Sequence, residues 1–218
     1  MATLEFHFDF ISPYAYLAWT QIHALAERYA AAVVPKPLLF AALLDANATK
    51  GPAEIPSKRL WVFKDTFRRA RYLGVPFAPP PAHPFNPLLA LRLASCELDG
   101  ADPRRVIDVL FAATWGGGPG VTDEAVVERL LRDAGLPAQA LLAEARSPAA
   151  KAKLRGATDE ALARGVFGVP TLFVDGELFW GLDAFDHVAR RLEGRDVLVE
   201  AEVERWRDLP VAAQRSPR

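Results

Sequence analysis

The stretch FHFDFISPYAYLA, residues 6–18, passes from a strand pattern into a helix pattern and decides the fold. Residues 4–11 alternate between two faces and are rich in aromatic side chains, which predicts a β-strand. Pro13 suits the first position of a helix, because its missing N–H would be unpaired there anyway. Ser12 is therefore predicted to cap this helix, with its hydroxyl beside free backbone N–H groups at the positive end of the helix dipole.

The position of Ser12 allows a structural and a catalytic interpretation. Ser followed by Pro is an ordinary way to begin a helix, and replacing such a cap with Ala costs about 1 kcal/mol in any protein. In a thioredoxin-like redox protein, the first Cys of a Cys-x-x-Cys motif stands at this junction. Residues 12–15 here are Ser-Pro-Tyr-Ala, without sulfur. If the junction is an active site, the thiolate that it stabilises must arrive with a cofactor.

Composition limits the classes of function. The chain of 218 residues suits one domain of moderate size or one domain with an insertion, and its 51% hydrophobic content is typical of a globular protein. A net charge of -1 lacks the electrostatic footprint of a nucleic-acid binder. No apolar run reaches the length of a membrane span, so no membrane partner is expected. A strand that begins within four residues leaves no room for a signal peptide, which predicts a cytoplasmic protein.

Sulfur and metal chemistry are not expected from this sequence. Cys96 is the single cysteine, so a dithiol oxidoreductase cycle is excluded, and its apolar helical surroundings predict a buried, inert thiol. The four histidines show no spacing typical of metal ligands, and no metal is expected. His7 alternates with its strand neighbours and is predicted to pack in the ordinary way.

The order of the predicted elements gives the fold class. A helix over residues 13–30 and a strand over 32–40 complete a βαβ unit, helices dominate 57–165, and strands return at 169–180 around an Asp175-Gly176 turn. A helix over 183–192 follows. The sequence therefore predicts an α/β fold, with a thioredoxin-like βαβ…ββα core and a helical insertion domain. The predicted units are a thioredoxin-like domain (1–40 and 166–195), an inserted helical domain (57–165) and a C-terminal extension (196–218) whose last residues are loose.

The helix that opens the insertion is predicted to begin at Ser57 and to end at Gly74. Its apolar residues fall on one side, which is expected to face the core: Leu60, Phe63, Phe67 and Ala70. Its basic residues are expected to form a solvated face: Lys64, Arg68, Arg69 and Arg71.

The segment Gly168-Val169-Pro170-Thr171 supplies the second half of the junction. A proline in a strand is uncommon unless it lies at an edge, at the first strand residue or at a bulge. In the thioredoxin architecture, this turn faces the N-terminus of the first helix and offers main-chain hydrogen bonds to a peptide-like ligand. The sequence leaves both isomers of the Val169–Pro170 bond open.

Five motifs in register give the chain a family resemblance. They are residues 8–17, 51–59, 84–86, 165–171 and 179–183. Together they resemble the 2-hydroxychromene-2-carboxylate isomerases, relatives of kappa-class glutathione transferases in the disulfide-oxidase branch of the thioredoxin fold. The resemblance runs from about residue 4 to residue 193. It implies glutathione as cofactor, a small aromatic acid as substrate, a place in aromatic compound catabolism, and a homodimer.

The resemblance also implies roles for individual residues. Ser12 would hydrogen-bond the glutathione sulfur as the catalytic group, Lys58 would pair with a glutathione carboxylate, and the Val169 backbone would hold the cysteinyl part. The γ-glutamyl end would be held by Trp180, Gly181, Leu182 and Asp183. The aromatic pocket would be lined by Asn47, Phe85 and Asn86. Three simpler roles stay open: Lys58 as a surface lysine, and Asn86 and Asp183 as helix caps.

The implied reaction is the interconversion of 2-hydroxychromene-2-carboxylate with ring-opened trans-o-hydroxybenzylidenepyruvate, through transient thiolate addition. Residues 45–52 depart from the Ala-Thr-Gly-Asn type of naphthalene-pathway members, so the glutathione half of the site matches better than the acceptor half. One alternative is a kappa-like glutathione transferase, in which the thiolate adds and stays. Another is a non-catalytic thioredoxin-fold binding module, which predicts no loss of function when Ser12 and Lys58 are replaced.

Overall fold

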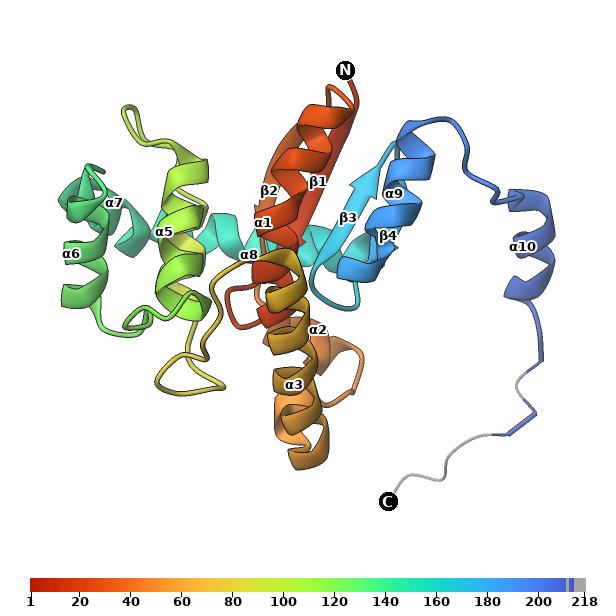
Figure 1. The fold of residues 1–218 in the computed structure, drawn as a ribbon, viewed down its shortest axis with the longest axis horizontal. Helices are drawn as coiled ribbons and strands as arrows, with labels where there is room; N and C mark the ends of the chain where they lie inside the picture. Colours follow the sequence, from red (N-terminus) through yellow and green to blue (C-terminus); the bar gives the residue numbers. More distant parts are fainter. Residues whose placement is uncertain (211, 214–218) are drawn as a thin grey trace.

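The computed structural model describes residues 1–210 and 212–213, and its centre is a mixed four-stranded sheet (Figure 1). The strands, in the spatial order β2-β1-β3-β4, are β1 (Thr3–Phe8), β2 (Ala32–Pro37), β3 (Thr171–Val174) and β4 (Glu177–Trp180). β1 pairs in parallel with β2, whereas β3 runs antiparallel to both β1 and β4. This order confirms the predicted thioredoxin-like βαβ…ββα core.

Helices cover both faces of this sheet. In Figure 1, α1 and α9 lie in front of the strands and α8 passes behind them. The first half contributes α1 (Pro13–Arg28), α2 (Phe40–Ala46), the short 3₁₀ turn η1 (Pro52–Glu54) and α3 (Pro56–Leu73). The middle contributes α4 (Leu88–Ala94), α5 (Pro103–Trp115), α6 (Glu124–Asp133), α7 (Ala138–Arg146) and α8 (Pro148–Ala163). The second half ends with η2 (Leu182–Ala184), α9 (Phe185–Leu192) and α10 (Glu200–Arg207).

The main hydrophobic core joins the strands to the helical middle. Leu4, Phe6 and Phe8 alternate along β1 and are fully buried in one cluster with residues of α1 and of α4 to α8. Trp115, at the end of α5, is also fully buried, and its indole Nε1–H donates to the Phe10 carbonyl oxygen at 2.7 Å. A smaller cluster around Phe173 packs on α8 and α2. The strand that leads to Ser12 is therefore supported directly by the helical region.

Two predicted boundaries near β1 and β2 are wrong. β1 ends at Phe8 rather than at residue 11, because residues 9–12 close a turn in which the Ser12 N–H donates to the Asp9 carbonyl oxygen. β2 ends at Pro37, and the sequence FAALLDA then forms α2, where the end of the strand was expected. Ala and Leu favour a helix once the strand has been interrupted.

The prediction for α3 is only partly correct. The helix begins at Pro56 with Ile55 as its N-cap, so Ser57 lies inside the first turn and caps nothing. Ala70 is buried, but Leu60 and Phe67 are 56% and 48% exposed, because the side of α3 that packs inward is shifted toward Thr66. Arg69 is not simply solvated, since it pairs with Asp65.

The C-terminal region contains an element that the sequence pattern did not predict. The expected last helix is present as η2 and α9, and the chain then continues into α10. The expectation of a loose chain end concerns residues 211 and 214–218, which lie outside the described part. Among the described residues, no helix combines the length and the apolar character needed to cross a bilayer.

His7 lies on the opposite face of β1 from the main core. It is 2% exposed, its ring centroid is 5.4 Å from that of Phe173, and neither ring nitrogen has a hydrogen-bond partner among the described residues. Burial, assisted by the positive charge of Arg164, lowers the pKa of His7 to about 4, although Glu5 opposes this shift. The folded protein therefore holds His7 neutral at pH values where the unfolded chain binds a proton.

His7→Leu is expected to remove part of the acid sensitivity of the fold. In the wild type, the free energy of unfolding should fall between pH 6.5 and pH 4, by up to about 3 kcal/mol from this group. The variant should show a shallower fall over this interval in urea unfolding curves. His187→Leu, at an exposed histidine of α9, is the control and should keep the wild-type slope. Equal slopes in the wild type and His7→Leu would contradict the prediction.

Candidate active site

Ser12 lies in the turn between β1 and α1 and is the N-cap of α1, as predicted. Its Oγ accepts a hydrogen bond from the Ala15 N–H at 3.2 Å. The hydroxyl donates to the Val169 carbonyl oxygen, 3.4 Å away, which is a long and weak hydrogen bond. The oxygen is thus held by the helix, while the hydroxyl proton can turn to a better acceptor.

Asp9 lies directly beneath the Ser12 turn. Its side chain is buried, Oδ1 accepts from the Ile11 N–H at 3.0 Å, and Oδ2 accepts from the Phe40 N–H at 2.9 Å. Burial raises the pKa of Asp9 to about 7, against the effect of the two N–H donors. One carboxyl group therefore ties the turn before α1 to the start of α2. Sequence analysis did not name Asp9, although an acidic residue between two aromatic residues at the end of a strand could have marked it as a buried carboxylate.

The loop before β3 meets Ser12 from the other side of the site. The Val169–Pro170 peptide bond is cis, and Val169 is almost fully buried. The Gly181 N–H donates to the Pro170 carbonyl oxygen at 2.9 Å, which joins this loop to the turn after β4. The Ser12 hydroxyl therefore meets the Val169 carbonyl, and Gly181 is joined to the next residue, Pro170, so three separate segments come together here.

The segment from Trp180 to Asp183 lies along one edge of this junction. The Trp180 indole packs so closely on Gly168 that a Cβ there would lie 2.5 Å from Nε1. Trp180 is 55% exposed, and its ring centroid lies 5.1 Å from that of Phe167. Leu182 is half-buried and Asp183 is exposed in η2, and no side chain caps α9, so Asp183 is not a helix cap. The segment offers an exposed aromatic surface and a carboxylate that has no hydrogen-bond or ion-pair partner among the described residues.

A charged cluster that sequence analysis missed lies between α1 and α3. The Tyr14 hydroxyl donates to Asp65 Oδ2 at 2.9 Å, and Arg69 Nε donates to the same oxygen at 2.6 Å. Burial raises the pKa of Tyr14, and the bond to Asp65 adds to the shift. The charge of Asp183 makes a small further contribution that raises the pKa values of Tyr14 and Arg69. The i, i+4 spacing of Asp65 and Arg69 in the sequence could have predicted this ion pair.

Lys58 lies on the first turn of α3 and is exposed. Within the described part of the chain, its ammonium group has neither an ion pair nor a hydrogen bond. The spacing of residues 58, 65 and 69 places them on one side of the helix. Lys58 therefore faces the same side as the Asp65–Arg69 pair, and its simpler role as a surface lysine stays open.

The three residues expected to line an aromatic pocket differ in their placement. His83 Nε2 lies 3.0 Å from the Ile11 carbonyl oxygen, which brings the 83–86 loop to the Ser12 turn. Burial lowers the pKa of His83. Phe85 is half-buried beside that ring. Asn86 and Asn47 are exposed, and their side chains bond to helix backbone, at the Leu88 N–H and the Leu43 carbonyl oxygen.

The single cysteine and the possible metal-ligating side chains test the predictions for Cys96 and for metal ligands. Cys96 is buried just after α4, as predicted, and burial raises the pKa of its thiol to about 11. Such a thiol carries almost no thiolate at neutral pH. In residues 1–210 and 212–213, no three His, Cys, Asp or Glu side chains are grouped so that they could hold a metal ion.

Comparison with known proteins agrees with this geometry. The profile of the DSBA-like thioredoxin domain matches residues 3–193. The 2-hydroxychromene-2-carboxylate isomerase of Sphingobium xenophagum is 32% identical over 186 residues, which cover 84% of this chain and 94% of that protein. Glutathione S-transferase kappa 2 of Caenorhabditis elegans is 28% identical over 85% of this chain and 89% of its own length.

Comparison with a solved structure indicates the same family. The structure of a selenomethionine 2-hydroxychromene-2-carboxylate isomerase superposes with a TM-score of 0.81 and 26% identity, and the match covers 88% of this chain and 95% of that one. The Sphingobium xenophagum isomerase matches at higher identity than the transferase, 32% against 28%, over nearly the same share of this chain, 84% against 85%. The chain therefore belongs to the DSBA-like thioredoxin family and, within it, to the 2-hydroxychromene-2-carboxylate isomerases.

Proposed function

We propose that the protein is a glutathione-dependent isomerase that interconverts 2-hydroxychromene-2-carboxylate-type aromatic acids and their ring-opened trans-o-hydroxybenzylidenepyruvate forms. The observation that carries this proposal is the weakly engaged hydroxyl of Ser12 at the N-terminus of α1, facing the Val169 carbonyl. An anion at that position would meet an O–H donor and the positive end of a helix. The names of the isomerase relatives supply the substrate class.

The residues around Ser12 fit a γ-glutamyl tripeptide. The buried Val169 backbone lies beside Ser12 and offers main-chain hydrogen bonds to the cysteinyl part. The Asp183 carboxylate would take the ammonium group, next to the exposed Trp180 ring and to Gly181 and Leu182. Lys58, on the side of α3 that carries Asp65, would take a carboxylate. Asp183 and Lys58 each have the charge that the proposed partner needs.

The chain's own residues would promote the reaction through a few interactions. Glutathione held by Ser12, Val169, Lys58 and Asp183 would supply the nucleophilic thiolate for reversible addition to the activated double bond of the substrate. The Ser12 hydroxyl would donate a hydrogen bond to the sulfur and so favour its anionic form, assisted by the N-terminus of α1. Asp9 positions the Ser12 turn through the Ile11 N–H. Phe85, with Asn86 and Asn47 at the rim, would line the aromatic acceptor.

The mass of the product separates the two catalytic interpretations. The isomerase should return a product of unchanged mass and should need glutathione only in catalytic amounts. A kappa-like transferase would instead release a conjugate that retains glutathione. Incubation of the protein with each isomer, followed by mass spectrometry and a glutathione balance, distinguishes them. Conjugate as the main product would overturn the proposal.

Gly181→Ala is expected to raise the dissociation constant for glutathione about tenfold or more. Gly181 has a φ of +91°, and an added Cβ would lie 2.7 Å from Asp183 Oδ1, so the carboxylate must move. Calorimetric titration with glutathione measures the effect. Gly176→Ala is the matched control, because its φ of +84° is equally unfavourable for Ala but nothing lies within 4 Å. Similar losses in both variants would show that the strain, rather than Asp183, is responsible.

We also propose a cytoplasmic protein and a homodimer. A single buried thiol suits a reducing compartment in which glutathione is abundant. The homodimer follows from the family resemblance. Both proposals are independent of the proposed roles of individual site residues.

A further inference from the structure

The peptide unit between Phe10 and Ile11 is held at both of its polar ends. Its carbonyl oxygen, on Phe10, accepts from the Trp115 indole Nε1–H at 2.7 Å. Its N–H, on Ile11, donates to Asp9 Oδ1 at 3.0 Å. Trp115 and Asp9 are both buried, so water does not compete for these two bonds. The unit therefore cannot rotate without breaking a buried hydrogen bond, which is costly.

The next peptide unit, between Ile11 and Ser12, is held in the same way. The Ser12 N–H donates to the Asp9 carbonyl oxygen at 3.1 Å, and His83 Nε2 lies 3.0 Å from the Ile11 carbonyl oxygen. This unit sets the position of the Ser12 backbone, from which Oγ extends toward the Val169 carbonyl. Asp9 acts on the unit through its main chain, whereas His83 reaches it with a side chain. His83 is thus a contact that a substitution can remove.

One state of the His83 ring makes this contact favourable. A carbonyl oxygen only accepts hydrogen bonds, so Nε2 must carry a proton. Nδ1 is buried and has no hydrogen-bond partner within the part of the chain that the structure describes. A proton on Nδ1, in the other tautomer or in the cation, would leave a buried N–H unpaired, which is costly. His83 is therefore a neutral ring that donates from Nε2.

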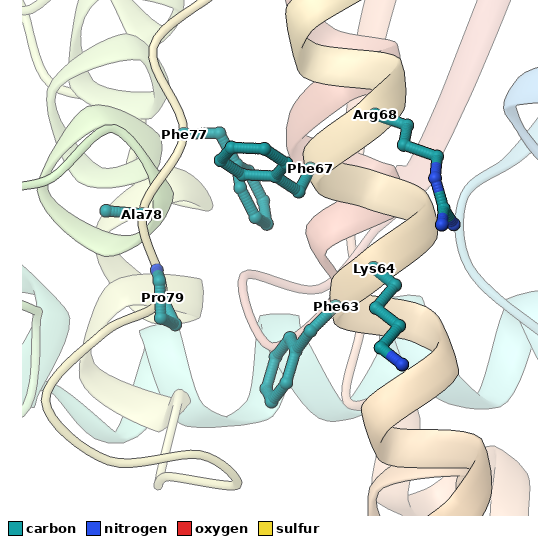
Figure 2. Close-up of a pocket in the computed structure, with 7 residues that line it drawn as sticks. All are labelled: Phe63, Lys64, Phe67, Arg68, Phe77, Ala78 and Pro79. Atoms are coloured by element: carbon teal, nitrogen blue, oxygen red, sulfur yellow. The ribbon is translucent and has the colours of Figure 1, made fainter.

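The surroundings of His83 fix the direction of this donor. Three aromatic rings meet the His83 ring at angles of 62° to 66°, with centroids 5.3 to 6.4 Å away: Phe63, Phe85 and Trp115. Figure 2 shows the Phe63 ring extending from α3 toward the 77–79 segment. Burial lowers the pKa of His83, and the charge of Arg59 adds to this shift, although the backbone hydrogen bond opposes it. Packing therefore orients the ring, and burial keeps it neutral.

We propose that His83 is a positioning residue for Ser12: its Nε2–H fixes the Ile11–Ser12 peptide unit and so directs the Ser12 hydroxyl at the sulfur of bound glutathione. This inference rests on the proposed function, because it concerns the same hydroxyl. Ser12 would contact the thiolate, whereas His83 acts only through the main chain. A displacement of about 1 Å in a reacting group can lower a rate about 100-fold. A donor that holds the turn therefore affects the chemistry without touching glutathione.

Two variants separate the donor from the bulk of the ring. Met and Gln have nearly the same length and shape, but only Gln can place an N–H donor near the position of Nε2. His83→Met should lower kcat/KM about tenfold and raise the pKa of the bound glutathione thiol, and His83→Gln should restore most of both. Loss of the aromatic contacts alone would affect the two variants equally. Circular dichroism melts verify that each variant is folded.

His23→Met is the matched control for these substitutions. His23 also packs on an aromatic ring, since its centroid lies 4.5 Å from that of Trp19, and its Nε2 is buried without a partner among the described residues. It lies on α1 about three turns beyond Ser12. The variant should keep the wild-type rate and thiol pKa.

A second set of measurements does not require glutathione. In the free protein, the nitrogen NMR signals of the His83 ring should show a protonated Nε2 and an unprotonated Nδ1. The Ser12 amide hydrogen should exchange with solvent about fivefold faster in His83→Met than in the wild type, because the turn opens more easily. The opposite tautomer, or unchanged exchange, would overturn the proposal.

The two sets of measurements distinguish failure of this proposal from failure of the proposed function. An unchanged thiol pKa in His83→Met, or equal losses in His83→Met and His83→Gln, would overturn the role of His83 while the isomerase activity stands. A wild type that neither binds nor uses glutathione would overturn the proposed function. The ring tautomer and the Ser12 exchange rate would then still decide whether His83 holds the turn.

Discussion

Ser12→Ala is expected to lower kcat/KM about 10- to 100-fold, because a hydrogen bond to a charged group contributes about 1.5–3 kcal/mol. The helix end that also favours the anion remains in the variant. The pKa of the bound glutathione thiol should rise toward the value of about 8.5 that is usual for a free thiol. Thiolate absorbance of the bound tripeptide as a function of pH measures this shift, beside the steady-state rates.

The chain contains a matched control for this substitution. Ser147 is also a serine N-cap followed by proline, and its Oγ accepts from the Ala150 N–H at 3.0 Å. Ser147→Ala should cost about the same 1 kcal/mol of stability as Ser12→Ala and should leave activity and the thiol pKa unchanged. Unaltered activity in Ser12→Ala, or an equal loss in both variants, would reduce Ser12 to a structural cap.

The β1–α1 junction could be predicted because its signals are local. A strand pattern, a serine and a proline at the first helical position specify the turn within a few residues, and Asp175-Gly176 does the same for the β3–β4 hairpin. The order of the elements then leaves few topologies. The residues assigned to glutathione were named through family resemblance, and their roles stay predictions, although Ser12, Val169 and Gly181 do lie together.

The charged cluster could not be predicted, because it depends on the packing of α1 against α3. The basic residues of α3 look alike in sequence, and only the neighbouring Tyr14 and Asp65 distinguish Arg69 from Arg68. The same reason explains the error over Leu60 and Phe67. A helical apolar pattern predicts that one face of the helix is buried, but it does not specify which of its residues the neighbouring elements cover.

Trp115→Ala is expected to lower the free energy of unfolding by about 3–5 kcal/mol, the usual range for truncating a fully buried large aromatic residue. The variant loses the stacked contact with Phe77, whose ring centroid lies 5.8 Å away. It also leaves the Phe10 carbonyl oxygen without its indole donor. Urea unfolding monitored by circular dichroism gives the change. Trp61→Ala, at a 58% exposed tryptophan of α3, is the control and should change stability by about 0.5 kcal/mol or less.

The number of unfolding transitions in Trp115→Ala tests whether the helical region and the Ser12 turn fold as one cooperative unit. Trp115 belongs to the helical middle, but its hydrogen bond reaches the residue two positions before Ser12, and both regions share one hydrophobic cluster. A single transition should therefore persist in Trp115→Ala, with the strands and the helices lost together. Trp115→Phe keeps most of the buried ring but removes the donor to Phe10. It should lower activity in conditions where the fold is intact, because the Ser12 turn loses a fixed point. Two separate transitions, or full activity in Trp115→Phe, would mean that the helical region folds and acts independently of the turn.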